Sequence, residues 1–300
     1  MKKIIVLGSC NTDMVVHAEH LPVPGETIIG GEFMMTPGGK GANQAVAASR
    51  LGGNVTFITK IGNDVFGRQS VELYQEENIN VDYVFSDPDN PSGVALIAVD
   101  RNAENCIVVA SGANKTLSKE DIDECREEIE SADILLMQFE IPLETVEYAA
   151  EIANKAGVKV ILNPAPASFL SDSLFLNTHM LIPNMTEAEI ISGVKVTDWE
   201  SAKRAADVIN GKGADVVIIT LGVLGALLKE NGTHHEIPIE VKVKALDTTA
   251  AGDTFCGALC VAVSEGMPLK DAIRFANRAA GISVTKMGTQ ISIPYRKEIV

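Results

Sequence analysis

Short apolar runs alternate along the chain with longer segments whose apolar residues recur every three to four positions. The runs predict buried strands at Ile4–Leu7, Val55–Ile61, Ile134–Phe139, Val158–Leu162, Met180–Ile182 and Val216–Leu221. The periodic segments predict helices at Phe66–Glu77, Leu143–Ala156, Glu200–Asn210, Ala251–Ser264 and Leu269–Thr285. Strands that alternate with helices in this way favour an α/β fold, in which helices cover both faces of a mostly parallel sheet.

Two regions interrupt this alternation. Residues 12–36 are rich in Pro and Gly, and residues 91–110 place two apolar segments around a polar turn at Asp100–Asn105. Both regions predict antiparallel hairpins, which are too far apart in the sequence to form an independent domain. We therefore expect one domain over residues 1–300, with a small β-sheet that protrudes from the edge of the main sheet.

The composition limits the kinds of binding partner and the cellular location that we expect for this protein. Hydrophobic residues make up 46% and charged residues 22% of the 300 positions, which favours a packed globular core. A net charge of -15 argues against nucleic acid or an anionic membrane as the main partner. The apolar run after Lys3 is too short for a signal peptide, so we expect a cytoplasmic protein. The five cysteines show no C-x-x-C spacing and are expected to be reduced and mostly buried.

Open parallel sheets bind ligands at the carboxyl ends of their strands. Asn11 and Asp13 follow the first predicted strand and could hold neighbouring hydroxyl groups, although an ordinary polar turn also explains them. Glu140 follows the predicted strand Ile134–Phe139.

A glycine-rich loop precedes an Ala-rich helix at Pro37–Ala47. Its glycines allow a ligand to approach the main chain, and Lys40 and Asn43 lie where the helix begins. The loop lacks the spacing of a Walker A motif. It indicates a polar ligand without identifying it.

Two further segments follow strand ends. Glu187 could face a metal-bound phosphate with Asn184 close by, because Mg²⁺ needs few protein ligands. The alternative is a helix start in which Thr186 is the N-cap and Glu189 is its third helical residue. The turn at Thr220–Gly225 could border a nucleotide.

The most specific signal is Asp247–Phe255, where small residues lead into a predicted helix. Successive backbone N–H groups at such a helix start bind anions. Asp253 could cap this helix. It could also take a proton from a hydroxyl group while the N–H groups receive a phosphoryl group.

With these motifs the chain resembles the ribokinase/PfkB carbohydrate kinase family over essentially its whole length. The segment Asp247–Phe255 matches the family at large, whereas Gly38–Ala48 with Asn11-Thr12-Asp13 resembles the ribokinase branch. Asn163–Ala167 and Asn184–Glu187 lie between them in the expected order. The resemblance implies a Rossmann-like, ribokinase-like fold in which the hairpins form a lid over the sugar.

The resemblance also implies ATP-dependent phosphorylation of D-ribose at its 5-hydroxyl, with Asp253 as the general base and the Ala250–Gly252 backbone as the anion hole. It assigns sugar contacts to Asn11, Thr12, Asp13, Gly39, Lys40, Gly41, Ala42, Asn43, Glu140 and Asp253. It assigns nucleotide contacts to Asn184, Glu187, Thr220, Leu221, Gly222, Val223, Leu224, Gly225, Gly252, Asp253 and Asn277.

The same resemblance implies Mg²⁺ with ATP, activation by K⁺, and a homodimer formed through the lid. The K⁺ ligands would be Asp247, Thr249, Ser283, Lys286, Gly288 and Ser292, several through backbone carbonyls. Met185 stands where a carboxylate is frequent in the family, and Val223-Leu224 makes the nucleotide turn more apolar.

Other functions remain open at this point. Another kinase of the family could act on deoxyribose, fructose or a nucleoside, although 5% aromatic residues disfavour a site that stacks on a base. A sugar-binding regulator without catalysis is the alternative from another class. The presence of Asp253, Gly252 and Glu187 argues against it.

Overall fold

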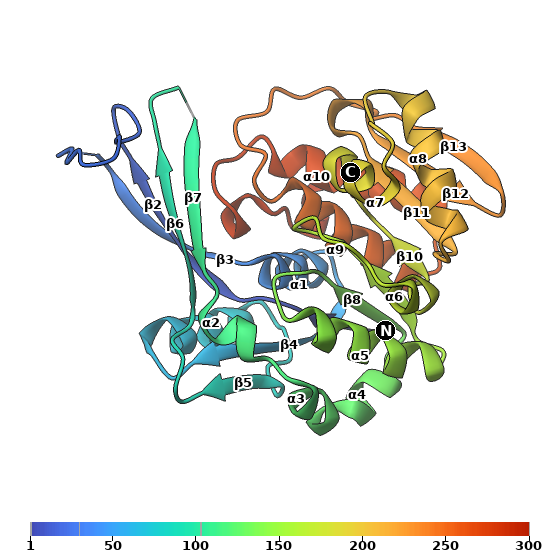
Figure 1. Cartoon of the computed structure of the whole chain (residues 1–300), viewed down its shortest axis with the longest axis horizontal. Helices are drawn as coiled ribbons and strands as arrows, with labels where there is room; N and C mark the ends of the chain where they lie inside the picture. Colours follow the sequence, from blue (N-terminus) through green and yellow to red (C-terminus); the bar gives the residue numbers. More distant parts are fainter. Residues whose placement is uncertain (1, 30, 103, 300) are drawn as a thin grey trace.

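The computed structural model describes residues 2–29, 31–102 and 104–299, and within them the main sheet has nine strands (Figure 1). From edge to edge these are β13 (Thr233–Ile237), β12 (Ala226–Glu230), β11 (Val216–Thr220), β10 (Met180–Leu181), β9 (Lys159–Leu162), β8 (Ile134–Met137), β1 (Lys3–Leu7), β4 (Asn54–Gly62) and β5 (Val84–Asp87). Neighbours from β11 to β5 are parallel, and only the β11–β12 and β12–β13 pairs are antiparallel. The expected mostly parallel sheet is confirmed.

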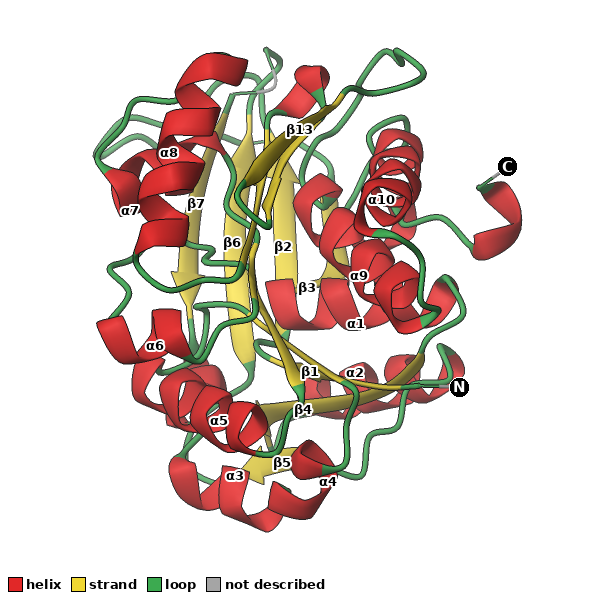
Figure 2. Ribbon diagram, turned by 90° about the vertical axis from the view of Figure 1, so that its right-hand side faces the viewer, coloured by secondary structure: helices red, strands yellow, loops and turns green. Residues whose placement is uncertain are grey.

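Helices cover both faces of this sheet (Figure 2). Side chains alternate along β1, so that Ile4 and Val6 face one core while Ile5 and Leu7 face the other. The first core is covered by α1 (Lys40–Arg50), α2 (Val65–Glu76), α9 (Ala251–Ser264) and α10 (Leu269–Ser283). The second core is covered by α3 (Lys119–Glu124), α4 (Arg126–Glu130), α5 (Leu143–Lys155), α6 (Asp172–Leu176), α7 (Met185–Ser192) and α8 (Trp199–Gly211).

A second sheet projects away from the main one (Figure 1). Its strands are β3 (Phe33–Gly38), β2 (Asn11–His17), β6 (Gly93–Val99) and β7 (Asn105–Ala110), in that order. The two hairpins β2–β3 and β6–β7 are antiparallel, as predicted. The parallel pairing of β2 with β6 joins them into one small sheet, which we call the lid sheet. Gly30 and Ala103, within the two predicted hairpin regions, lie outside the described residues, as do residues 1 and 300.

Most predicted elements are present with their ends moved by one or two residues, and helix α9 has the predicted bounds. The sequence patterns missed the edge strands β5 and β13, the neighbouring strand β12, and the short helices α3, α4 and α6. The β12–β13 hairpin was missed because charged and His residues interrupt its apolar positions. Short 3₁₀ turns at Gly112–Thr116, Gly222–Leu224, Gln290–Ser292 and Arg296–Glu298 complete the chain.

All five cysteines are free, and four of them, Cys10, Cys125, Cys256 and Cys260, are buried. The prediction of reduced and mostly buried thiols is therefore confirmed, with Cys106 on β7 as the exposed exception. Within residues 2–29, 31–102 and 104–299, no helix has both the length and the apolar character needed to cross a bilayer.

Helices α1 and α9 cross unusually closely. A Cβ atom added to Gly257 of α9 would lie 2.6 Å from the Cβ atom of Ala47 and 2.8 Å from the carbonyl oxygen of Gln44 in α1. Only a glycine allows the two helix backbones to approach this far without overlap. The N-terminal turns of both helices are thereby brought to the same edge of the main sheet.

Candidate active site

Helix α1 begins directly against the end of β1 because of two glycines. Gly39, its N-cap, has a φ of 88°, a region that favours glycine. A Cβ atom at Gly41 would lie 2.5 Å from the backbone nitrogen of Ser9, and the Ala42 N–H donates to the Ser9 carbonyl at 2.9 Å. Lys40 and Asn43 lie at the helix start, as the sequence predicted, and the contacts with Ser9 bring this start to the carboxyl end of β1.

Asn11 and Asp13 belong to β2 of the lid sheet, which makes the polar-turn alternative wrong. Both side chains are buried on one face of β2, and Thr12 points to the opposite face because side chains alternate along a strand. The Asn114 amide donates to Asn11 Oδ1 at 2.8 Å. Gly38 lies so close to Asp13 that a Cβ atom there would be 2.2 Å from its carboxylate.

Glu140 lies beyond the carboxyl end of β8 and is connected to α1. Its Oε2 atom accepts hydrogen bonds from the Ser9 hydroxyl at 2.6 Å and from the Lys40 backbone N–H at 2.9 Å. The contacts hold the Glu140 carboxylate beside the start of α1.

Asp253 is the third residue of α9, and its side chain does not cap the helix. Ala250 is the N-cap, without a side-chain hydrogen bond, so the capping alternative is wrong. The Asp253 carboxylate turns toward α1, where Oδ2 accepts from Asn43 Nδ2 at 3.0 Å and Oδ1 accepts from Gln44 Nε2 at 2.9 Å. Only 8% of Asp253 is exposed, so these two amides replace the water that an ionised carboxylate needs.

The charges of Asp253, Glu140 and Glu187 act on the ammonium group of Lys40, and those of Glu140 and Asp253 also act on Asp13. Burial raises the pKa of Asp253, whereas Lys40 and the two amides lower it. Burial, followed by the charges of Glu140 and Asp253, raises the pKa of Asp13 to about 7. Conversely, the pKa of Lys40 is raised, first by Asp253. The cluster gives a mostly buried site with several acceptors for hydroxyl groups and one cation.

The first turn of α9 presents unpaired backbone donors beside Asp253. In the described part of the chain the N–H groups of Ala250, Gly252 and Asp253 meet no acceptor, whereas the Ala251 N–H donates to the Thr248 carbonyl at 3.2 Å. A Cβ atom at Gly252 would meet nothing within 4 Å, so packing does not explain this glycine. An exposed glycine among free N–H groups leaves room for an anion to approach the backbone.

Asn184 and Glu187 form a reciprocal capping box at the start of α7. Asn184 Oδ1 accepts from the Glu187 N–H at 2.9 Å, and the Glu187 carboxylate accepts from the backbone N–H and the side-chain amide of Asn184. The alternative N-cap at Thr186 is therefore wrong, because the cap lies two residues earlier. The carboxylate of Glu187 is buried and already hydrogen-bonded.

The other residues predicted to contact the nucleotide include the Thr220–Gly225 turn and Asn277. Asn184 forms an isolated bridge with Thr220, and the Thr220 N–H donates to the Pro183 carbonyl at 3.0 Å. The turn that follows, Leu221–Gly225, closes on itself, leaving Val223 82% exposed. Asn277, on α10, donates to the Ile237 carbonyl at 3.4 Å rather than to the turn.

Three of the six predicted cation residues are brought together. The Asp247 carboxylate accepts from the Thr249 N–H and hydroxyl and from the Gly288 N–H at 2.9 Å. Of the others, the Lys286 N–H donates to the Ser283 carbonyl, and the Ser292 hydroxyl to the Thr289 carbonyl. Thr289 in turn donates to the Pro37 carbonyl at 2.7 Å, which links this C-terminal segment to β3.

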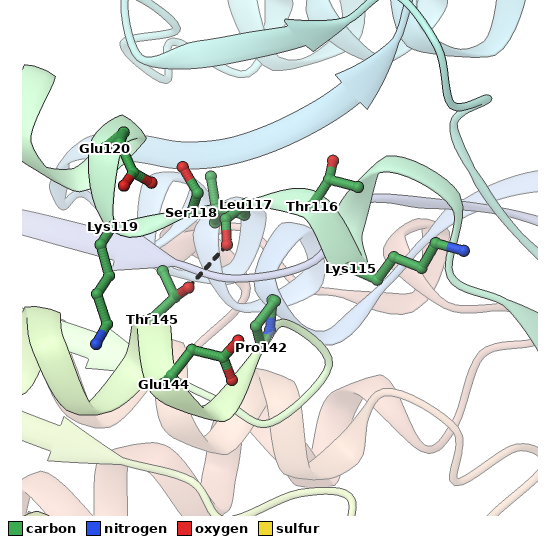
Figure 3. A pocket seen from close by; sticks show the side chains of 9 residues that line it. All are labelled: Lys115, Thr116, Leu117, Ser118, Lys119, Glu120, Pro142, Glu144 and Thr145. Atoms are coloured by element: carbon green, nitrogen blue, oxygen red, sulfur yellow. Dashed lines mark hydrogen bonds between the residues drawn. The ribbon is translucent and has the colours of Figure 1, made fainter.

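Two cavities share Lys115 and Pro142 in their walls. One has a volume of about 480 Å³ and is lined by Asn11, Asn114, Phe139, Glu140 and Pro166, among others. Its walls combine the base of the lid sheet with the end of β8. The other, of about 350 Å³, lies between α3 and α5 and contains none of the predicted site residues (Figure 3).

Several polar residues at the site were not assigned any role from the sequence. They are Ser9, Gln44, Asn114, Gln138 and Asn163, all of which are buried. Each hydrogen-bonds to a predicted site residue or to a residue that does. Gln44 and Asn163 do stand inside the recognised motifs, and that position is the one signal that could have singled them out.

The chain is similar to known proteins over almost its whole length. The profile described as "pfkB family carbohydrate kinase" matches residues 1–296. The chain is 47% identical to a ribokinase of Haemophilus influenzae, over 99% of this chain and 97% of that protein. It is 38% identical to a deoxyribokinase of Salmonella typhi, over 97% and 95%. A solved structure of an Arabidopsis thaliana ribokinase complexed with ribose and ATP superposes with a TM-score of 0.92 at 32% identity, covering 99% and 97% of the two chains.

The raised pKa of Asp13 predicts a stability effect. Because its folded-state pKa of about 7 exceeds the ordinary value of 3.8, the carboxyl group favours folding less and less as the pH rises from about 4 to 7. Asp13→Asn should therefore raise the Tm of the ligand-free protein at pH 8 by about 2–5 °C, and by less at pH 5. Thermal unfolding at both pH values measures this.

Asp82→Asn, at an exposed carboxylate, is the matched control and should leave Tm nearly unchanged. A Tm gain for Asp13→Asn that is equal at pH 5 and pH 8 would contradict a buried, pH-dependent charge at Asp13.

Proposed function

The chain belongs to the pfkB family of carbohydrate kinases, and on this premise we propose that it transfers the γ-phosphoryl group of ATP to the 5-hydroxyl of D-ribose. The identity to named ribokinases and the ribose and ATP in the Arabidopsis thaliana complex support both substrates. The observation that carries the proposal is the Asp253 carboxylate, buried beside an unpartnered amide oxygen and next to free backbone donors.

The unpartnered atom is Asn43 Oδ1, which is buried without any hydrogen-bond donor. The amide nitrogen of Asn43 donates to Asp253, so the oxygen of the same amide group also lies close to the proposed base. A sugar hydroxyl that donates to this oxygen satisfies it and is held near Asp253. The same contact supports the proposal that Asn43 belongs to the sugar site.

Asp253 acts as the general base. Its carboxylate takes the proton from the 5-hydroxyl as the bond between O5 and the γ-phosphorus forms. The bond from the γ-phosphorus to the bridging oxygen breaks, and its electron pair leaves with ADP. The free N–H groups at the start of α9 stabilise the charge on the transferred phosphoryl oxygens. The resemblance implied an anion hole formed by the Ala250–Gly252 backbone. Because the Ala251 N–H already donates to Thr248, we propose that the anion hole consists of the N–H groups of Ala250, Gly252 and Asp253.

The remaining sugar hydroxyls are proposed to bind Asn11, Asp13, Lys40, Asn43 and Glu140. Their side chains, together with the backbones of Gly39, Gly41 and Ala42, surround the start of α1. Thr12 faces the other side of β2, so a role for it would be through its backbone. Carboxylates accept from sugar hydroxyls, and Lys40 offsets their charge.

ATP is proposed to lie between the α9 turn and the Thr220–Gly225 turn. Asn184, adjacent to Thr220, would contact its phosphates, with Gly252 beside them and Asn277 further along. The exposed Val223 and Leu224 offer an apolar surface to an adenine ring. Because ATP is the donor, we propose a cytoplasmic location.

Mg²⁺ would neutralise charge on the ATP phosphates. Both oxygens of Glu187 already accept from Asn184, so we propose that this carboxylate acts on the ion through coordinated water rather than directly. The donors around Asp247 also fit a monovalent cation, because oxygen atoms of Asp247 and Thr249 converge there and the Lys286 ammonium is directed away to Glu298. Ser283, Lys286, Gly288 and Ser292 would supply carbonyl oxygens.

Deoxyribose is the second candidate sugar, because a deoxyribokinase is 38% identical over nearly the whole chain. Fructose and a non-catalytic regulator receive no comparable support. Within the proposed single domain, we propose that the lid sheet covers the sugar while ATP enters from the other side.

The proposed base predicts a clear loss of turnover. Asp253→Asn keeps the shape of the side chain but cannot accept a proton, so kcat with ribose should fall by about 10²–10⁴-fold while ribose still binds. A pentose panel with coupled ADP detection measures turnover, and calorimetry measures binding. Faster turnover of deoxyribose than of ribose by the unmutated protein contradicts ribose as the main substrate, and unchanged turnover in Asp253→Asn contradicts the base.

The Asp247 site predicts cation dependence. Exchanging K⁺ for Na⁺ should lower kcat without weakening ribose binding, because the site lies beside the α9 turn rather than among the sugar residues. Asp247→Ala should remove the difference between the two cations. Equal rates in K⁺ and Na⁺ for the unmutated protein would remove the cation from this proposal.

The lid sheet predicts a homodimer. It exposes an unusual number of large apolar side chains for a protein surface, namely Val16, Phe33, Met34, Met35, Leu96, Ile107, Val108 and Val109. Light scattering after size exclusion should give twice the chain mass, and Leu96→Glu should shift it toward the monomer. A monomeric unmutated protein at working concentration contradicts pairing through the lid.

A further inference from the structure

Gln44 is completely buried in α1 and contacts the proposed base directly. Its Nε2 donates to Asp253 Oδ1 at 2.9 Å and to Asn163 Oδ1 at 3.1 Å. Its Oε1 accepts from Gln138 Nε2 at 2.6 Å. Both hydrogens of the amide and one lone pair of its oxygen are therefore in use.

The orientation of this amide is determined by its neighbours. Turning the Gln44 amide over would place Oε1 against the oxygens of Asp253 and Asn163, which are both acceptors, and Nε2 against the donor of Gln138. Three hydrogen bonds would be lost together. The observed orientation is thus the one that points a donor at Asp253.

Two strand ends hold the partners of Gln44. Gln138 follows β8 and is fully buried, and it packs so tightly on Gly8 that a Cβ atom there would lie 2.0 Å from Gln138 Oε1. Asn163 follows β9, and its Nδ2 donates to the Ile182 carbonyl at 2.9 Å. The amide of Gln44 is consequently fixed by the main sheet and not only by its own helix.

We propose that Gln44 is a positioning residue for Asp253, and that Gln138 acts through it by directing the Gln44 amide nitrogen at the carboxylate. With Asn43 on the other oxygen, the two amides hold the carboxylate in one orientation and favour its ionised form. The inference rests on the proposed function, in which Asp253 is the base.

The charged and titratable groups around Asp253 come from every element packed against it. Lys40 lies on α1, Asp13 on β2 and Glu140 after β8, while Glu187 faces it from α7 and Cys256 from its own helix. Among them only Lys40 favours the ionised form. Because the hydrogen bond from Gln44 lowers the pKa of Asp253, its loss should raise this pKa further, in the direction in which burial and the charge of Glu140 already act.

The test is the pH profile of kcat at saturating ribose and ATP, which reports groups in the bound complex. Gln44→Met removes the donor at nearly constant volume and should move the acid limb up by about one pH unit, so that kcat on the acid limb falls roughly tenfold and largely recovers at alkaline pH. The ribose KM should change little. Gln138→Met should shift the limb in the same direction but less, and the double variant should resemble Gln44→Met alone.

Thr145→Val is the control, because it removes a buried hydrogen bond from the Thr145 hydroxyl to the Leu117 carbonyl, drawn as a dashed line in Figure 3. Neither residue hydrogen-bonds to Asp253. It should leave the acid limb in place. Gln138→Met carries the test should Gln44→Met fail to fold, because it leaves Gln44 present but removes the donor to its Oε1.

The possible failures are distinguishable. An unshifted limb in both Gln variants, with kcat lowered equally at every pH, overturns the role of Gln44 while Asp253→Asn still abolishes turnover. Additive shifts in the double variant overturn the action of Gln138 through Gln44. Retained turnover in Asp253→Asn overturns the base, and the positioning role with it.

Discussion

A carboxylate that is kept away from water must be stabilised by other groups, and much of this structure follows from that constraint on Asp253. Its two oxygens receive amide hydrogens from Asn43 and Gln44, while the cation of Lys40 lies nearby. Without these groups burial would protonate the acid, and a protonated acid cannot act as a base. On balance the pKa of Asp253 is still raised, because burial outweighs these groups and the charge of Glu140 adds to it.

Such a balance depends on where two helices meet. Helix α1 carries the amides and helix α9 carries the carboxylate, so an error in their crossing would separate donors from acceptor. The glycine at position 257 sets that distance, and Gly39 and Gly41 set where α1 begins against β1. The glycines of this protein thus matter to its chemistry because they determine backbone separations of less than one side-chain length.

Much of the fold could be predicted because the spacing of apolar residues along a strand or a helix is a local property of the sequence. Helix α9 has the predicted bounds, and its first turn was identified from the small residues that precede Asp253. The partners of Asp253 were harder to find, since Gln44 is 209 positions away and resembles any helical residue. Asn11 and Asp13 have turn-like neighbours, yet pairing of β2 with β3 and β6 makes them part of a strand. Tertiary contacts decided these cases, and no local pattern reports them.

The crossing of α1 and α9 also has a consequence for how the chain is made. A ribosome releases α1 long before α9, so the apolar stripe of α1 and its buried amides have no permanent partner while most of the remaining chain is synthesised. The contact of Thr289 with Pro37 comes later still, since it joins β3 to a segment near the end of the sequence. Translation can therefore produce the central strands in order, but the proposed reaction centre is completed only after the last helices have emerged. A nascent chain halted before residue 251 would contain all nine described strands of the main sheet but would lack the proposed base Asp253.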